Sequence, residues 1–128
     1  MATILIVDDD EKMITLYRDI LSKEGFNVLT STNGKDGLKL AVQEVPSLIL
    51  LDVMMPEISG TDVIDSLMRN ERTRNIPVIF LTSLVTEEEV FDSKGEIGGR
   101  LYVSKSAGKK ELLRRIREVT GGEKYSIS

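Results

Sequence analysis

The chain has 128 residues and a formal net charge of −4. This suits one compact domain and argues against a general nucleic-acid-binding surface. Cys and His are both absent from the sequence, which excludes disulfide scaffolds, Cys-ligated metal sites and His-dependent catalysis. Any chemistry must therefore use carboxylates, Lys and hydroxyl groups. No basic leader precedes the first apolar run, and no apolar stretch reaches the ~20 residues of a membrane span, so we expect a cytoplasmic location.

The N-terminal part of the sequence predicts a strand, a helix and a second strand. A β-branched run at residues 4–7 is typical of a strand buried on both faces. Asp10 can cap the helix that follows, and Gly25 can end it. Residues 26–29 predict the second strand. The apolar stripe of the helix is Met13, Leu16, Tyr17, Ile20 and Leu21.

The middle of the chain repeats the pattern twice. A turn at Asn33-Gly34 leads into a helical pattern that closes before Pro46, and residues 48–51 predict the third strand. A further helical pattern precedes a fourth strand at residues 77–81. The apolar stripe of the second helix is Leu38, Ala41, Val42 and Val45, and that of the third is Val63, Ile64, Leu67 and Met68.

The last part of the chain contains the weakest helical pattern and one strong one. Thr86 to Glu89 fits a capping box for a fourth helix, but few apolar positions follow it. Residues 101–103 predict a fifth strand. The last helix, ended by Gly121-Gly122, has the stripe Leu112, Leu113, Ile116 and Val119.

Five successive strand–helix units predict an α/β fold. Buried strands joined by helical crossovers form a parallel sheet covered by helices on both faces, which is a three-layer, doubly wound αβα domain. We assign residues 1–122 to this domain and residues 123–128 to a C-terminal tail.

Polar residues gather where the predicted strands end. Asp8 and Asp9 follow the first strand, Asp52 the third, Thr82 the fourth and Lys105 the fifth. Ligands of doubly wound sheets bind beyond the carboxyl ends of the strands, so these side chains are the candidate site. Neighbouring carboxylates repel one another unless a positive charge lies among them, and Mg²⁺ with its preference for oxygen ligands fits that need. A carboxylate nucleophile, a metal ion and an ammonium group together predict phosphoryl transfer.

The residues at these strand ends resemble the receiver domains of two-component response regulators over residues 3 to about 120. The acidic run after the first strand resembles the acidic pocket of that family. Leu50 to Pro56, with Gly60 beyond, resembles its phosphorylation-site motif. Leu81-Thr82-Ser83 resembles its hydroxyl switch, and Gly98, Tyr102 and Lys105 follow in the family's order.

The resemblance implies a flavodoxin-like (β/α)5 fold whose five parallel strands have the order 2-1-3-4-5. It implies that Asp52 accepts the phosphoryl group and that Thr82 and Lys105 hold it. The implied ligands of Mg²⁺, or of Mn²⁺, are Asp8, Asp9, Asp52 and the backbone carbonyl of Met54. Thr82 and Tyr102 would be the switch pair, whose movement changes the output surface.

The resemblance also implies partners. The phosphoryl donor would be a histidine kinase or a His-phosphotransfer protein, because this chain has no His. The phosphorylated domain would act on a downstream effector protein or domain and could form a homodimer. We expect no direct nucleic-acid binding and no membrane association. The domain would be a signalling module rather than an enzyme, catalysing only its own phosphorylation and dephosphorylation.

Two departures from the family pattern keep other functions open. Ser106 follows Lys105 where the family usually has Pro, and Gly99 stands where Ala is usual. One alternative is therefore a pseudo-receiver, an interaction module that is not phosphorylated. Another is a Mg²⁺-dependent aspartyl phosphohydrolase, although Met54 stands where such enzymes have a second Asp. A flavin-binding domain is disfavoured because the acidic residues after the first strand would repel a phosphate.

Overall fold

The fold comes from a computed structural model that describes residues 2–53, 60–82, 96–97, 100–105 and 108–120. Strands and helices alternate along most of the described chain, as the sequence predicts. The strands are β1 (Thr3–Val7), β2 (Asn27–Ser31), β3 (Leu48–Asp52), β4 (Val78–Thr82), β5 (Glu96–Ile97) and β6 (Arg100–Ser104). The helices are α1 (Glu11–Lys23), α2 (Gly34–Glu44), α3 (Gly60–Arg69) and α5 (Lys109–Val119).

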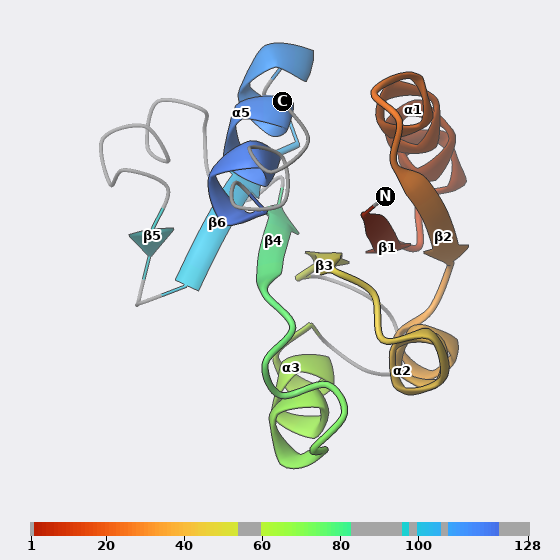
Figure 1. The fold of residues 1–128 in the computed structure, drawn as a ribbon, viewed down its shortest axis with the longest axis vertical. Helices are drawn as coiled ribbons and strands as arrows, with labels where there is room; N and C mark the ends of the chain where they lie inside the picture. The colour runs from red at the N-terminus through yellow and green to blue at the C-terminus, as the bar shows by residue number, and fades with distance from the viewer. Residues whose placement is uncertain (1, 54–59, 83–95, 98–99, 106–107, 121–128) are drawn as a thin grey trace.

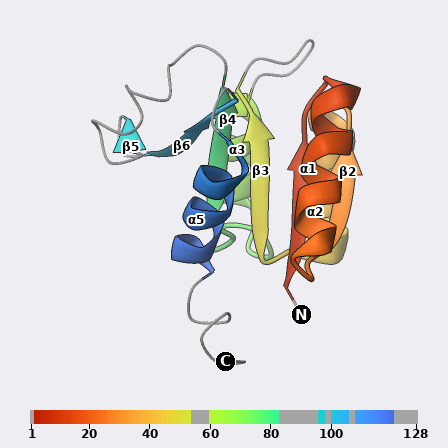
Figure 2. The same ribbon diagram turned by 90° about the horizontal axis from the view of Figure 1, so that it is seen from above.

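The strands form one sheet in the order β2-β1-β3-β4-β6-β5. All neighbours from β2 to β6 pair in parallel, which confirms the predicted parallel sheet with strand order 2-1-3-4-5. The sequence did not predict β5, a short strand that pairs antiparallel with β6 at the sheet edge. Helices α1 and α5 cover one face of the sheet and α2 and α3 cover the other, which confirms the three-layer architecture (Figure 1). Figure 2 shows α1 and α5 together in front of the strands.

Two core clusters occupy the two faces of the sheet, because successive strand residues point to opposite sides. We call the cluster beneath α1 and α5 the first cluster, and the one beneath α2 and α3 the second cluster. In β1, Ile4 and Ile6 belong to the first cluster, whereas Leu5 and Val7 belong to the second. Every residue of β3 is buried, as expected for the central strand of a covered sheet.

The predicted apolar stripes of the helices identified most core-facing positions correctly but were wrong at three. Leu16, Val45 and Met68 are largely exposed rather than part of the core. In α1, the buried residues are Ile14, Tyr17 and Leu21. The core-facing side of that helix is thus turned relative to the predicted stripe, so that Ile14 replaces Leu16.

Helix ends follow local chemistry. Asp10 caps α1 by accepting hydrogen bonds from the backbone N–H groups of Lys12 and Met13, as predicted. Asn33 caps α2 through the N–H of Asp36, so the predicted turn at Asn33 is the start of that helix. Gly25 follows α1 with a φ of 93°, a conformation that favours glycine. The predicted fourth helix lies outside the described residues, as do Gly121 and Gly122. None of the helices in the described part of the chain is long and apolar enough to cross a membrane.

Candidate functional site

The carboxyl ends of four parallel strands meet at one edge of the sheet and carry the predicted site residues. Asp8 follows β1, Asp52 ends β3 and Thr82 ends β4, while Lys105 follows β6. The ladder continues into this region, because the N–H of Asp8 bonds to Ser31 O (3.1 Å) and the N–H of Lys105 bonds to Thr82 O (2.8 Å). Backbone pairing therefore fixes the main-chain positions from which the side chains of Asp8 and Lys105 extend.

The structure brings Asp8, Asp52 and Lys105 into contact. Lys105 Nζ lies 2.9 Å from Asp8 Oδ2 and 3.4 Å from Asp52 Oδ2. Asp8 is fully buried and Asp52 is 3% exposed. The alternation of β1 and β3 places both carboxylates on the side of the sheet covered by α1 and α5. This is a buried ion-pair group at the edge where such folds bind ligands.

Asp8 is held at one carboxylate oxygen and open at the other. Its Oδ1 accepts hydrogen bonds from the N–H of Asp10 (2.9 Å) and from Lys105 Nζ (3.2 Å). Its Oδ2 is in ion-pair contact with Lys105 but accepts no hydrogen bond from the residues that the structure describes. A buried oxygen of this kind can take a further ligand.

The charges of the site act on Lys105. Burial alone lowers the pKa of its ammonium group, but the hydrogen bond and charge of Asp8, and then Asp52, act more strongly in the other direction. The pKa of Lys105 is therefore raised above its ordinary value, and the group is positively charged at neutral pH. It provides a fixed positive charge beside Asp52.

The acidic residues fit a hard divalent cation. Carboxylate oxygens of Asp8, Asp9 and Asp52 all lie within 4.8 Å of one another, with Asp9 exposed and the other two buried. Ionised, these groups carry three negative charges against the single positive charge of Lys105. Oxygen ligands and an uncompensated negative charge are what Mg²⁺ binding requires. The fourth predicted ligand, the carbonyl of Met54, lies outside the described residues.

Thr82 and Tyr102 lie on neighbouring strands, on the face opposite the carboxylates. Thr82 is 3% exposed and pairs in register with Ser104, another buried hydroxyl residue. The Tyr102 ring stacks on Phe80 with ring centroids 5.2 Å apart, and it packs against the second cluster. Strand alternation places Thr82, Phe80 and Tyr102 on the same face. Ser83, Gly98 and Ser106 lie outside the described residues.

Tyr17 of α1 is a polar residue near the site that the sequence reasoning treated only as core. Burial, followed by the charges of Asp8, Asp52 and Asp10, raises the pKa of its phenol above the ordinary value. The phenol therefore stays protonated at neutral pH and can donate a hydrogen bond. A tyrosine on the core face of the helix that follows an acidic strand end is the sequence signal that could have found it.

Comparisons with known proteins agree with this geometry. Residues 4–117 match the model of the response regulator receiver domain. The chain is 37% identical over 122 residues to Protein PilH of Pseudomonas aeruginosa, covering 95% of this chain and all of that protein. It is 39% identical over 118 residues to Histidine kinase P4 of Formosa agariphila, covering 92% of this chain but only 8% of the kinase.

A solved structure shows the same fold. The response regulator from Desulfuromonas acetoxidans is 31% identical, and the match has a TM-score of 0.78 and covers 94% of this chain and 98% of that one. The family match, the identity to these relatives and the sheet topology point to the same conclusion. The chain belongs to the family of response regulator receiver domains, the signalling modules of two-component systems.

Proposed function

We propose that this receiver domain accepts a phosphoryl group on Asp52 from a histidine kinase or a His-phosphotransfer protein. The observation that carries the proposal is the Lys105 ammonium, held between the buried carboxylates of Asp8 and Asp52 at the ligand-binding edge of the sheet. The chain has no His, so the phosphohistidine belongs to the partner. The domain would be a signalling module, and its only catalysis would be its own phosphorylation and dephosphorylation.

In the transfer step, an Asp52 carboxylate oxygen attacks phosphorus, and the bond from phosphorus to the donor nitrogen breaks. The electron pair of that bond stays with the imidazole ring, which leaves neutral when its other nitrogen carries a proton. The product is an acyl phosphate on Asp52. The fixed position of Asp52 at the end of β3 supports this step, because phosphoryl transfer depends mainly on positioning and charge stabilisation.

Asp8, Asp9 and Asp52, with the backbone carbonyl of Met54, would hold Mg²⁺ or Mn²⁺. The ion would supply positive charge that offsets the negative charge of the phosphoryl oxygens. Lys105 would give a second positive charge to one phosphoryl oxygen, and its raised pKa keeps it charged. Each of these groups acts by position and charge, and none has to transfer a proton.

Thr82 and Tyr102 would carry the signal to the surface. Thr82 would move toward the phosphoryl group and donate a hydrogen bond from its hydroxyl group to a phosphoryl oxygen. This movement would change the space open to the Tyr102 ring on the same face of the sheet. A local charge change would in this way shift a two-state surface, which a downstream effector protein or a second copy of the domain would recognise. The half-buried position of Tyr102 beside Phe80 supports this role.

Incubation with acetyl phosphate and Mg²⁺, followed by intact-mass measurement, tests the proposal. We expect one added phosphoryl group, lost in EDTA and in Asp52→Asn. Asp19→Asn, which changes an exposed carboxylate on α1, is the matched control and should be modified like the wild type. Modification that persists in Asp52→Asn would place the acceptor elsewhere, and a protein that binds Mg²⁺ without being modified would be a pseudo-receiver.

A further inference from the structure

Four side chains near the carboxyl ends of β4 and β6 form two rows on one face of the sheet. In the first row, Phe80 pairs in register with Tyr102, and their rings stack with centroids 5.2 Å apart. In the second row, Thr82 pairs in register with Ser104. Strand alternation places both rows on the side of the sheet that α2 and α3 cover. The proposed function gives roles to Thr82 and Tyr102, and Ser104 is the polar residue of this group that it does not use.

The register brings Thr82 and Ser104 side by side. The main chains of neighbouring strands lie about 4.8 Å apart, and paired residues of parallel strands direct their side chains to the same face. The pairing continues past this row, because the N–H of Lys105 bonds to Thr82 O at 2.8 Å. Hydroxyl side chains on neighbouring strands reach hydrogen-bond distance by rotation between staggered χ1 rotamers.

Both hydroxyl groups are shielded from bulk water. Ser104 is 2% exposed and Thr82 is 3% exposed, and neither residue is without an interaction partner in this structure. A hydroxyl group has a single hydrogen to donate and two lone pairs that accept. Once Thr82 donates that hydrogen to a phosphoryl oxygen, its own oxygen can only accept, and a buried acceptor requires a donor. Ser104 is the neighbouring hydroxyl in register with it.

We propose that Ser104 is a positioning residue for Thr82. Its hydroxyl donates a hydrogen bond to the Thr82 oxygen while Thr82 donates to a phosphoryl oxygen on Asp52. Because β4 separates β6 from β3 in the sheet, Ser104 acts through Thr82 and not on the phosphoryl group itself. Successive hydrogen bonds in a buried chain strengthen one another, so Ser104 both holds Thr82 in place and makes its hydroxyl a better donor. This inference rests on the proposed function and adds a residue to it.

A time course of phosphorylation with acetyl phosphate and Mg²⁺, followed by intact-mass measurement, tests the role through a double-mutant cycle. We expect Ser104→Ala to slow phosphorylation about two- to tenfold, the factor that corresponds to loss of one hydrogen bond. In a Thr82→Ala background, which keeps Asp52 as the acceptor, the same substitution should change the rate much less. Equal slowing in the two backgrounds, or a wild-type rate in Ser104→Ala, would overturn the proposal.

Ser31→Ala is the matched control for the loss of a buried hydroxyl. Ser31 ends β2, at the same edge of the sheet, and its hydroxyl donates to Asn33 O at 2.8 Å. It lies far from Thr82 in the strand order, so this variant should be phosphorylated at the wild-type rate. Slowing of the same size in Ser31→Ala would refute a specific role of Ser104.

Calorimetric Mg²⁺ titration separates positioning from general damage to the site. Ser104 is not among the proposed metal ligands, so Ser104→Ala should keep the wild-type Mg²⁺ affinity although its phosphorylation is slower. A parallel loss of Mg²⁺ affinity would show a structural effect on the acidic pocket and overturn the positioning role. A wild type that is not phosphorylated at all would refute the proposed function and this role with it, whereas a failure of the Ser104 role alone leaves phosphorylation of the wild type intact.

Discussion

Lys105 contacts two buried carboxylates but lies closer to Asp8 than to Asp52, at 2.9 Å against 3.4 Å. Asp52 is therefore buried, lies beside another carboxylate, and has the longer of the two contacts with Lys105. Without a metal ion, repulsion between like charges at such short range destabilises the fold. We therefore expect the residue proposed to accept phosphate to destabilise the fold of the metal-free protein.

We expect Asp52→Asn to raise the free energy of unfolding by about 1 kcal/mol in EDTA, because it removes one buried charge and keeps the side-chain shape. Added Mg²⁺ should reduce or reverse the difference, since the ion stabilises only the wild-type carboxylate set. Urea unfolding at neutral pH measures both. Asp19→Asn is the control, and a variant less stable than the wild type in EDTA would contradict this view of the site.

Most of the candidate site could be predicted from single residues at strand ends. Asp8, Asp9, Asp52 and Lys105 were identified because the carboxyl ends of parallel strands share one edge. Tyr17 was not identified as a site residue, because helical periodicity counts a tyrosine as apolar and does not reveal where its hydroxyl points. Lys105 lies nearer to Asp8 than to Asp52, and this difference also depends on side-chain packing, which the spacing of residues in the sequence does not reveal.

At the scale of elements, α2 packs against β1 at a position that requires glycine. A Cβ on Gly37 would lie 2.7 Å from Val7 Cγ2 and 2.9 Å from Val7 Cγ1. Alanine normally favours a helix over glycine by about 1 kcal/mol, but here the overlap with a buried side chain decides the sign. The close approach of α2 also helps to hold β1, which leads into Asp8.

We expect Gly37→Ala to lower the free energy of unfolding by about 1–3 kcal/mol through overpacking. Thermal or urea unfolding checks the value. In a Val7→Ala background, which removes the two methyl groups in question, the same substitution should cost much less or become stabilising. Equal costs in the two backgrounds would show that the Val7 contact is not the cause.

Helix α5 carries a network of ion pairs between residues one turn apart. Glu111 pairs with Arg114 (2.9 Å) and Arg115 (3.2 Å), and Glu118 pairs with the same two residues. Burial alone raises the pKa of Glu111, but the two arginines, Arg114 first, lower it by more. A carboxyl group with a lowered folded-state pKa stabilises the fold above its unfolded pKa, and this contribution is lost as the pH falls through the folded pKa.

Glu111→Gln should therefore cost about 0.5 kcal/mol at pH 7, a modest value because these groups are partly solvated. The cost should shrink as the pH falls below the ordinary glutamate value of 4.5 and vanish in stronger acid. Urea unfolding at several pH values measures it. Glu71→Gln, at an exposed position outside this network, is the control. An effect of Glu111→Gln that is constant with pH would contradict the ion-pair explanation.

Element types were more predictable than the exact faces of helices. Leu16 has the spacing of a core residue but is half exposed, whereas Ile14 is buried. A stripe of apolar residues can be drawn in more than one way when a helix is rich in them, and tertiary packing selects the face. Strand β5 was missed because a two-residue strand has no periodicity, and only its antiparallel pairing with β6 defines it.

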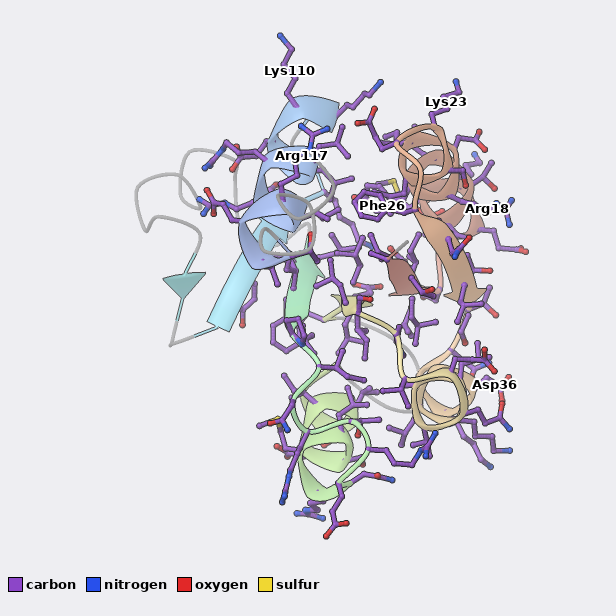
Figure 3. The ribbon with its side chains drawn as sticks, viewed as in Figure 1. Arg18, Lys23, Phe26, Asp36, Lys110 and Arg117 are labelled. Carbon is purple, nitrogen blue, oxygen red and sulfur yellow. The ribbon has the colours of Figure 1, made fainter. Side chains whose placement is uncertain are left out.

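At the scale of the whole molecule, repetition of strand and helix predicted the parallel sheet with helices on both faces. Periodicity alone does not give the strand order, which came from the resemblance and is confirmed by the pairing of β1 with both β2 and β3. Helices α1 and α5, which cover the site's side of the sheet, are linked near their C-terminal ends. Arg117 of α5 forms an ion pair with Glu24, the residue after α1, at 2.6 Å. Figure 3 shows Arg117 and Phe26 in the space between these helices.

Under the proposed function, the two faces of the sheet would have different tasks. By strand alternation, the carboxylates and Lys105 lie on the side of the sheet that α1 and α5 cover, while Thr82 and Tyr102 lie on the opposite side. A signal that begins in the acidic pocket would in this way reach a surface on the other side of the sheet. The proposed signalling route requires that Asp52 is the phosphorylated residue.

The most direct measurement locates the phosphoryl group. The protein is phosphorylated with acetyl phosphate and Mg²⁺, the acyl phosphate is reduced with borohydride, which converts the modified aspartate to homoserine, and the peptides are sequenced by mass spectrometry. We predict homoserine at position 52 and unmodified aspartate at positions 8 and 9. Homoserine at position 8 or 9, or at none of the three in a protein that carries the phosphoryl group, would contradict this prediction.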